Sequence, residues 1–191
     1  MSSTHKSWTP YCTSYNPLEA GSIDRTDTEP HDNAIARALN STFTPNPSIK
    51  SRPEYSIFVS RLNFNTDEST LRRIFSEFGD ILTCSLIRDI VTGASKGYAF
   101  IEFKSRSSVE AATRTANKSE LDGRIIFVDK EIGRTMKGWI PRRYGGGFGG
   151  NKNSGQLRFG GRDRPFKKPI SKEETKEERR SHSSHSKYER R

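Results

Sequence analysis

Positions 96–103, Lys-Gly-Tyr-Ala-Phe-Ile-Glu-Phe, alternate between two kinds of side chain. Successive side chains of a β-strand point to opposite faces of its sheet. One face would therefore carry small and apolar side chains suited to packing, at Gly97, Ala99, Ile101 and Phe103. The other would carry charged and aromatic side chains, at Lys96, Tyr98, Phe100 and Glu102. Such a strand requires a sheet with one covered face and one open face.

The surrounding segments predict a domain at residues 54–130. Strands are expected at 56–60, 81–87, 96–103 and 125–128, where β-branched and aromatic residues cluster. A helix is expected between Asp67 and Gly79, where the apolar residues Leu71, Ile74, Phe75 and Phe78 follow helical spacing. A second helix is expected at Ser107, which has capping-box spacing to Glu110. The order βαββαβ predicts an α+β fold, a split βαβ sandwich with both helices on one sheet face.

The open face of this sheet is expected to hold three aromatic rings. Phe58 joins Tyr98 and Phe100 there if the first and third strands pair, because its two neighbours in the strand are apolar. Exposed aromatic rings usually have a ligand that covers them. Unpaired RNA bases fit, since each stacked base contributes about 1 to 3 kcal/mol, and Lys96 is placed to neutralise a phosphate. The alternative is that Tyr98 and Phe100 are core residues. The apolar Ile101 argues against it, because the alternation places Ile101 on the covered face and its two neighbours Phe100 and Glu102 on the open face.

Two short segments resemble the RNA recognition motif family. Residues 96–103 are similar to its RNP1 octapeptide at every position, and residues 57–62, Ile-Phe-Val-Ser-Arg-Leu, are similar to its RNP2 hexapeptide. The resemblance implies that Phe58, Tyr98 and Phe100 stack on bases. It also departs from the family at Arg61, where the usual residue is Asn, so the contact made there is expected to differ.

The flanks differ from the domain in composition. Residues 1–53 are rich in Ser, Thr, Pro and Asp and are expected to be extended and irregular, apart from a short helix near 32–39 that Asp32 could cap. Residues 131–170 combine Gly, Arg and aromatic residues, and 171–191 form a charged tail expected to be disordered. Residues 131–191 hold 17 basic and 7 acidic side chains, which accounts for the whole net charge of +10. A polyanion such as nucleic acid, or simple solvation of the tail, explains that excess.

The segment after the domain interleaves aromatic and basic side chains. Trp139, Phe148, Phe159 and Phe166 alternate with arginines that include Arg142, Arg143, Arg158, Arg162 and Arg164. Such a pattern can stack on bases and contact phosphates, so Arg142 and Arg143, with Lys130 at the end of the domain, join the expected RNA contacts. The alternative is a plain flexible linker, although glycine linkers seldom need so many aromatic and basic residues.

Two sequence segments that flank the domain indicate a more specific function, because the fold alone does not determine function. Both segments resemble proteins of the spliceosomal small nuclear ribonucleoprotein particles, the minor-class particle in particular. They are residues 15–24, Tyr-Asn-Pro-Leu-Glu-Ala-Gly-Ser-Ile-Asp, and residues 134–143, Arg-Thr-Met-Lys-Gly-Trp-Ile-Pro-Arg-Arg. The resemblance covers about residues 15–170. It implies a nuclear protein of pre-mRNA splicing that binds a small nuclear RNA of the minor-class particle, one that pairs with the 5′ splice site, and contacts other proteins of that particle.

Several other functions are disfavoured or remain open. The glycine-rich run at 145–150 lacks the Lys-Ser/Thr ending of a phosphate-binding loop. The sequence also shows no recognisable pair of a nucleophile and a base. Neither an enzyme nor a small-molecule substrate is therefore expected. The two cysteines and four histidines suggest no metal site, no cofactor is expected, and no apolar run is long enough for a membrane helix. A major-class particle, a general pre-mRNA-binding role and a protein-interaction module remain alternatives.

Overall fold

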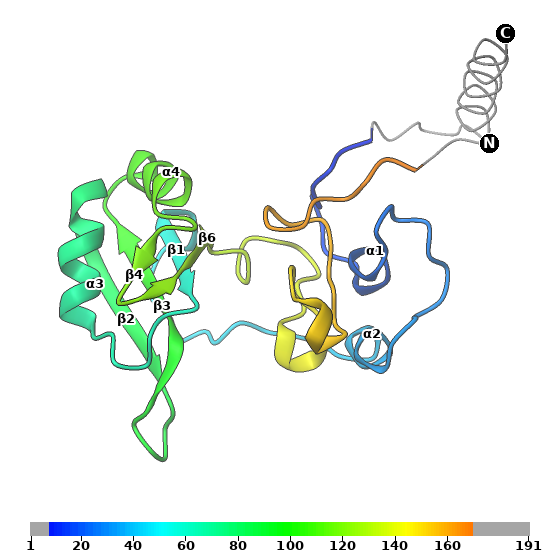
Figure 1. Ribbon diagram of the computed structural model, residues 1–191, viewed down its shortest axis with the longest axis horizontal. Coiled ribbons are helices and arrows are strands. Elements are labelled where there is room, and N and C mark those ends of the chain that lie inside the picture. The colour runs from blue at the N-terminus through cyan, green and yellow to red at the C-terminus, as the bar shows by residue number, and fades with distance from the viewer. Residues whose placement is uncertain (1–7, 170–191) are drawn as a thin grey trace, which may run out of the picture. The chain divides into compact units, whose positions relative to one another are not determined.

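The computed structural model describes residues 8–169 and divides them into two compact units (Figure 1). The first, here called the sheet domain, is Phe43–Trp139. The second, here called the flank unit, is formed by residues 8–42 together with 140–169. The charged tail expected at 171–191 lies outside the described residues.

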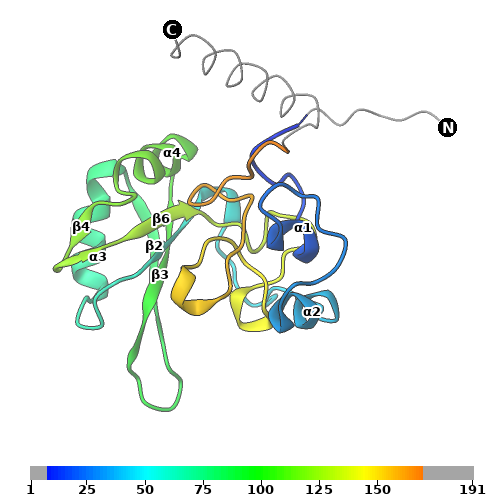
Figure 2. The same cartoon turned by 45° about the vertical axis from the view of Figure 1, so that its right-hand side comes forward.

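The sheet domain contains a four-stranded antiparallel sheet. Its order is β2-β3-β1-β6, and the strands are β1 (Ser56–Ser60), β2 (Ile81–Arg88), β3 (Ser95–Phe103) and β6 (Phe127–Lys130). Helices α3 (Glu68–Phe75) and α4 (Arg106–Thr115) cover one face, and the loop between β2 and β3 projects beyond the sheet (Figures 1 and 2). The predicted βαββαβ order and the α+β class are confirmed, with the pair β4 (Glu120–Leu121) and β5 (Arg124–Ile125) added before the last strand.

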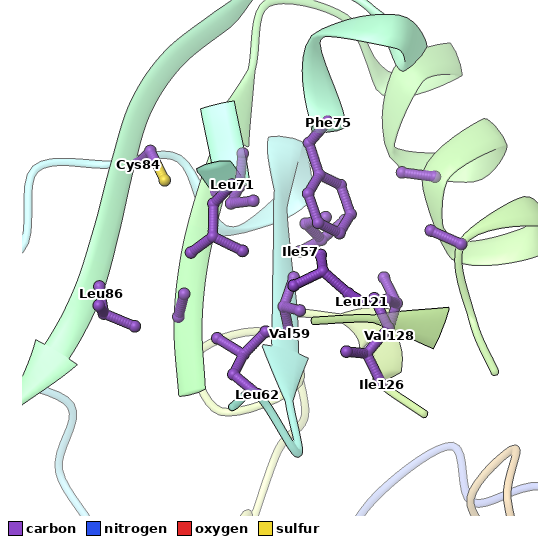
Figure 3. Close-up of a cluster of buried hydrophobic side chains, with 14 of the residues drawn as sticks. Ile57, Val59, Leu62, Leu71, Phe75, Cys84, Leu86, Leu121, Ile126 and Val128 are labelled. Carbon is purple, nitrogen blue, oxygen red and sulfur yellow. The ribbon is translucent and has the colours of Figure 1, made fainter. Parts of the chain in front are cut away.

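Apolar side chains from the covered face and the two helices form the core. Ile57 and Val59 of β1 point toward Leu71 and Phe75 of α3, and all four are fully buried (Figure 3). Ala99, Ile101 and Phe103 of β3 are equally buried, as the alternation of residues 96–103 predicts. Burying a side chain of this size stabilises the fold by about 1.5 to 3 kcal/mol.

Side-chain caps define where the two helices begin. The Asp67 carboxylate accepts a hydrogen bond from the Thr70 amide (2.8 Å), and after α3 a short 3-10 turn, Ser76–Phe78, leads to Gly79 with φ of 145°. The predicted cap of the second helix is wrong, because Ser105 and not Ser107 is the cap, with its hydroxyl accepting from the Ser107 amide (3.2 Å). The helix therefore begins two residues earlier than the capping-box spacing suggested.

The last strand is also displaced from its predicted position. Strand β6 spans Phe127–Lys130 instead of 125–128. Ile125 pairs with β4 and is 60% exposed, while the backbone amide of Ile126 donates to Ser119 (3.0 Å). The β-branched pair Ile125-Ile126 resembles a strand of the main sheet by composition. Its backbone instead forms hydrogen bonds in and beside the small hairpin of β4 and β5.

The flank unit joins two segments that are far apart in the sequence. It contains α1 (Pro17–Gly21), which was not predicted, α2 (Asn33–Leu39), and the short 3-10 helices Arg142–Tyr144 and Lys152–Ser154. The predicted cap of α2 is confirmed, since Asp32 accepts from the Ile35 amide (2.7 Å). Most of the remaining backbone is irregular, as expected.

Backbone hydrogen bonds connect the two segments of the flank unit. Cys12 donates to Gly160 (2.8 Å), Phe159 to Ala20 (2.6 Å) and Phe166 to Pro10 (2.8 Å). Gly160 has φ of 88°, and a Cβ there would lie 2.5 Å from the Cys12 sulfur, so the close approach requires glycine. This pairing of the two flanks was not visible in the sequence.

Arg158 lies at the centre of the flank unit and is fully buried. Its Nη1 and Nη2 atoms donate to the two carboxylate oxygens of Asp32 (3.0 and 3.1 Å), and Nε and Nη2 donate to the Gly145 carbonyl (3.0 and 2.9 Å). Phe159 and Phe166 are also buried. Arg158, Phe159 and Phe166 therefore pack inside the flank unit, so only some of the interleaved aromatic and basic side chains of this segment face solvent.

Candidate nucleic-acid interface

Three aromatic side chains lie together on the open face of the sheet. The pairing of β1 with β3 places Phe58 opposite Phe100 and Ser60 opposite Tyr98. The ring centroid of Phe58 is 5.8 Å from the ring centroid of Tyr98 and 5.5 Å from that of Phe100. The ring centroids of Tyr98 and Phe100 are 6.2 Å apart. All three side chains are half-buried, whereas their neighbours on the covered face are fully buried. The alternation along each strand therefore places the rings as predicted.

This arrangement suits flat, apolar ligands. The rings contact one another at tilted or edge-on angles. Each side chain is only half-buried, so part of it faces solvent. Bases of single-stranded nucleic acid stack on such rings with little regard to sequence.

Phe127 of β6 is a fourth aromatic side chain on this face. It pairs with Ser60 of β1, and it is half-buried while the next residue, Val128, is fully buried. The guanidinium carbon of Arg61 lies 5.4 Å from its ring centroid. No role was predicted for Phe127, although its alternation with Ile126 and Val128 within the expected strand 125–128 could have revealed it.

Arg61 follows β1 with φ of 64°, in the left-handed region. Asn adopts this conformation more readily than most residues, which gives a physical reason for the Asn that the RNA recognition motif family usually has there. In this chain the position instead directs a guanidinium toward Phe127 on the open face. The departure from the family pattern thus adds a positive charge beside the rings.

Lys96 and Glu102 lie at opposite ends of β3. Lys96 is exposed, and its ammonium is 3.5 Å from Asp89, an exposed pair that contributes little. Glu102 is buried, and its carboxylate accepts from Arg52 Nε (3.1 Å), the Arg52 amide (3.2 Å) and the Thr83 hydroxyl (3.2 Å). Burial favours a raised pKa for Glu102, but these hydrogen bonds outweigh it and hold the pKa below its usual value. The carboxylate is therefore charged and compensated by Arg52.

Lys130 lies on the other face of the sheet from the rings. It alternates with the open-face residue Asp129, and its ammonium is 3.7 Å from Glu110 of α4. We therefore leave Lys130 out of the proposed RNA surface, since its side chain extends toward the helices. This placement was not predicted, because the last strand was expected two residues too early.

Arg142 and Arg143 belong to the flank unit and not to the domain that carries the rings. Arg142 Nη1 donates to the Gln156 carbonyl (2.9 Å), and burial, followed by the charge of Arg158, lowers the pKa of Arg142. The Arg143 guanidinium carbon is 5.0 Å from the centroid of the Tyr144 ring. Arg142 thus has a structural role within its loop, and Arg143 remains an exposed candidate for an RNA contact.

The described part of the chain offers neither a metal cluster nor a membrane helix. Between residues 8 and 169 no three His, Cys, Asp or Glu side chains are grouped so that they could hold a metal ion. None of the helices in that range has the length and apolar character needed to cross a membrane.

Comparison with known proteins identifies the family. The model of the RNA recognition motif matches residues 57–126. The chain is 57% identical over 164 residues to the U11/U12 small nuclear ribonucleoprotein 35 kDa protein of Xenopus laevis, covering 86% of this chain and 60% of that protein. It is 55% identical over 164 residues to the protein of the same name from Danio rerio, covering 86% of this chain and 79% of that protein. The chain belongs to the family of U11/U12 small nuclear ribonucleoprotein 35 kDa proteins.

The similarity to this 35 kDa family extends beyond the sheet domain. Its 164 aligned residues exceed the length of the unit Phe43–Trp139, so residues of the flank unit are matched as well. The U1 small nuclear ribonucleoprotein 70 kDa protein of Drosophila melanogaster is a more distant relative, 44% identical over 103 residues, covering 54% of this chain and 23% of that protein. The chain spans 60% of the length of the Xenopus laevis 35 kDa relative.

Proposed function

We propose that this chain is an RNA-binding component of the minor spliceosome and that the open sheet face binds a small nuclear RNA of its particle. The observation that carries the proposal is the group Phe58, Tyr98 and Phe100, with ring centroids 5.5 to 6.2 Å apart on an uncovered face. Unpaired bases stack on these rings, while Lys96 and Arg61 supply positive charge beside them.

Membership of the 35 kDa family supports the choice of particle. Its members are named for the U11/U12 small nuclear ribonucleoprotein, whereas the U1 70 kDa relatives match a shorter part of the chain. We infer that the partner is the minor-class RNA that pairs with the 5′ splice site during pre-mRNA splicing. Other proteins of the same particle are the remaining partners, and the nucleus is the place of action.

The proposal predicts that removing one ring weakens RNA binding without unfolding the domain. Tyr98→Ala and Phe100→Ala, each in the full chain, should weaken binding to transcribed U11 or U12 RNA by about 1 to 3 kcal/mol, because each loses one stacked base. Tyr98→Phe keeps the ring and should bind almost as the unchanged chain does. A fluorescence titration gives the affinities, and circular dichroism shows whether each variant is folded.

Folded Tyr98→Ala and Phe100→Ala variants with unchanged affinity would contradict the proposal. Such a result would favour a protein-interaction module instead. Equal loss of binding in Tyr98→Phe would show that the hydroxyl, and not the aromatic face, makes the contact.

A further inference from the structure

Ile90 and Val91 occupy the tip of the loop between β2 and β3. Their side chains are 99% and 92% exposed, more than any other exposed large hydrophobic side chain of residues 8–169. The loop projects beyond the rest of the sheet domain in both views (Figures 1 and 2). Almost none of the apolar surface of these two side chains is therefore buried within the described chain.

Hydrogen bonds within the loop hold this tip in a defined conformation. The Asp89 carboxylate accepts from the amides of Val91 and Thr92 (3.1 Å each) and from the Thr92 hydroxyl (3.2 Å). The Gly93 amide donates to the Asp89 carbonyl (2.9 Å). The two apolar side chains are thus presented in a preorganised arrangement, which lowers the entropic cost of binding a partner.

The fold does not require apolar side chains at the tip. Turn positions favour Gly, Pro, Asn, Asp and Ser, whereas β-branched residues such as Ile and Val favour strands. Ile90 and Val91 nevertheless lie in the turn, where their exposure leaves them almost no burial to contribute to stability. Residues that break a local rule without a gain in stability are expected at functional sites.

The charges around the tip favour a protein over RNA as its ligand. Residues 89–95 hold no lysine or arginine. Two cations lie at the base of the loop, where Arg88 Nη1 donates to a backbone carbonyl of the loop (3.2 Å) and the Lys96 ammonium is 3.5 Å from Asp89. Hydrogen bonds from the Thr92 amide and the next amide lower the pKa of Asp89, so its carboxylate stays negative beside the apolar pair. A phosphate at the tip would meet no cation of the loop and one carboxylate.

We propose that Ile90 and Val91 are the point at which another protein of the same particle docks, in an apolar pocket with a basic side chain at its rim opposite Asp89. The inference rests on the proposed function, since the partner belongs to the particle whose RNA the sheet binds. The pocket removes both apolar side chains from water, and the basic rim complements the carboxylate. Tip-to-tip contact with a second copy fits less well, because it brings two Asp89 carboxylates together.

The docking point and the RNA surface use different residues. The apolar pair lies in a loop, whereas the aromatic rings lie on strands β1 and β3. The tip can therefore be changed without removing a ring. This separation allows protein docking and RNA binding to be measured independently.

The first test replaces the apolar pair by residues that suit a turn. In the full chain, Ile90→Asn combined with Val91→Asn should leave the thermal unfolding midpoint unchanged or higher, because no buried surface is lost. The double variant should also bind transcribed U11 or U12 RNA within about twofold of the unchanged chain. In particles purified from nuclear extract through a tag on the chain, it should retain the RNA but recover one protein of the particle about tenfold less or lower.

The matched control is Ile49→Asn. Ile49 is another exposed apolar side chain of the sheet domain, and it lies outside the loop between β2 and β3. Its replacement should leave both the RNA and the protein composition of the purified particle unchanged.

Photo-cross-linking identifies what the tip contacts. With Val91→p-benzoylphenylalanine in the tagged chain, irradiation of the purified particle should join the tip to a peptide of another particle protein that contains apolar and basic residues. That protein should be the one that the double Asn variant recovers less well. The same photoreactive residue at Ile49 should not cross-link to that peptide.

The outcomes separate this contact from the function on which it rests. A cross-link from position 91 to RNA, or to a second copy of the chain, would reject the docking point. An unchanged protein composition in the double Asn variant would also reject it, while leaving RNA binding by the sheet intact. If the unchanged chain binds neither U11 nor U12 RNA, the proposed function itself fails.

Discussion

Arg158 is the residue on which the two segments of the flank unit converge. Its guanidinium binds the Asp32 carboxylate and the Gly145 carbonyl, and none of the side chain reaches solvent. Burial opposes ionisation of Asp32, but hydrogen bonds from Arg158 and from the Ile35 amide hold the pKa of Asp32 below its usual value. The Asp32 carboxylate is therefore charged, and its burial depends on the guanidinium of Arg158.

Removing this guanidinium should destabilise the flank unit. Arg158→Ala removes the guanidinium that binds the Asp32 carboxylate and the Gly145 carbonyl, at an expected cost of about 1 to 3 kcal/mol. Hydrogen exchange of the α2 amides should become faster, while exchange in the sheet domain stays the same. The control is Arg162→Ala, at an exposed arginine of the same segment. Unchanged protection of α2 in Arg158→Ala would mean that the pair is not needed.

Single residues also show what the sequence can and cannot reveal. The positions of Phe58, Tyr98 and Phe100 follow from alternation, because a two-residue period depends only on local backbone geometry. The burial of Arg158 depends on Asp32, which is 126 residues away in the sequence. No local sequence pattern predicts a partner at that separation. The same holds for Arg52, whose role is to compensate Glu102.

At the scale of elements, helix α4 begins at a different cap from the one that the sequence predicted. Ser105 and Ser107 are both serines near the helix start, and their hydroxyls are hydrogen-bonded to each other (2.6 Å). Ser105 is the residue with extended backbone whose side chain accepts from a helix amide. The motif Ser-x-x-Glu at 107–110 has the correct spacing, but it lies inside the helix, so spacing alone did not locate the boundary.

The two serines provide a matched test. Ser105→Ala should lower the free energy of unfolding of the sheet domain by about 1 kcal/mol, because a helix amide loses its acceptor. Ser107→Ala removes a hydroxyl from inside the helix and should cost less. Urea unfolding of both variants gives the comparison. A larger cost for Ser107→Ala would restore Ser107 as the cap.

The last strand shows a second limit at this scale. Its composition was recognised, but the strand was expected two residues too early, because the hairpin of β4 and β5 pairs Ile125 before β6 begins. A displacement of two residues leaves the alternation of faces unchanged. It did place Lys130 outside the expected strand, so the face on which Lys130 lies was not predicted. A short hairpin is held together by backbone hydrogen bonds, so the types of its side chains give little indication of where it lies in the sequence.

For the whole molecule, the excess positive charge is concentrated in one part of the chain. Residues 131–169 hold 10 basic and 2 acidic side chains, a net charge of +8 out of the total of +10. Arg158 and Arg134 are paired with Asp32 and Glu131. The side chains of Arg143, Arg162 and Lys168 are exposed in this segment, where they could contact RNA phosphates.

This distribution predicts how binding depends on salt. Deleting residues 170–191 removes a net charge of only +2 and should leave the slope of log K against log salt nearly unchanged. Replacing Arg143, Arg162 and Lys168 by Gln should flatten the slope by about 0.7 for each phosphate that is no longer neutralised. Titrations at several salt concentrations give both slopes. A slope that falls on deletion of 170–191, but not on the triple replacement, would assign the phosphate binding to the terminal segment.

If this chain binds the RNA of the minor-class particle through its sheet, that RNA should accompany the chain in nuclear extract. The tagged chain would be purified from the extract at mild salt and its bound RNA sequenced. We predict one dominant small nuclear RNA, the minor-class RNA that pairs with the 5′ splice site, enriched over U1 RNA and depleted when Tyr98 is replaced by Ala. Recovery of mainly U1 RNA, or of a broad population of transcripts, would show that the chain does not bind the minor-class RNA specifically.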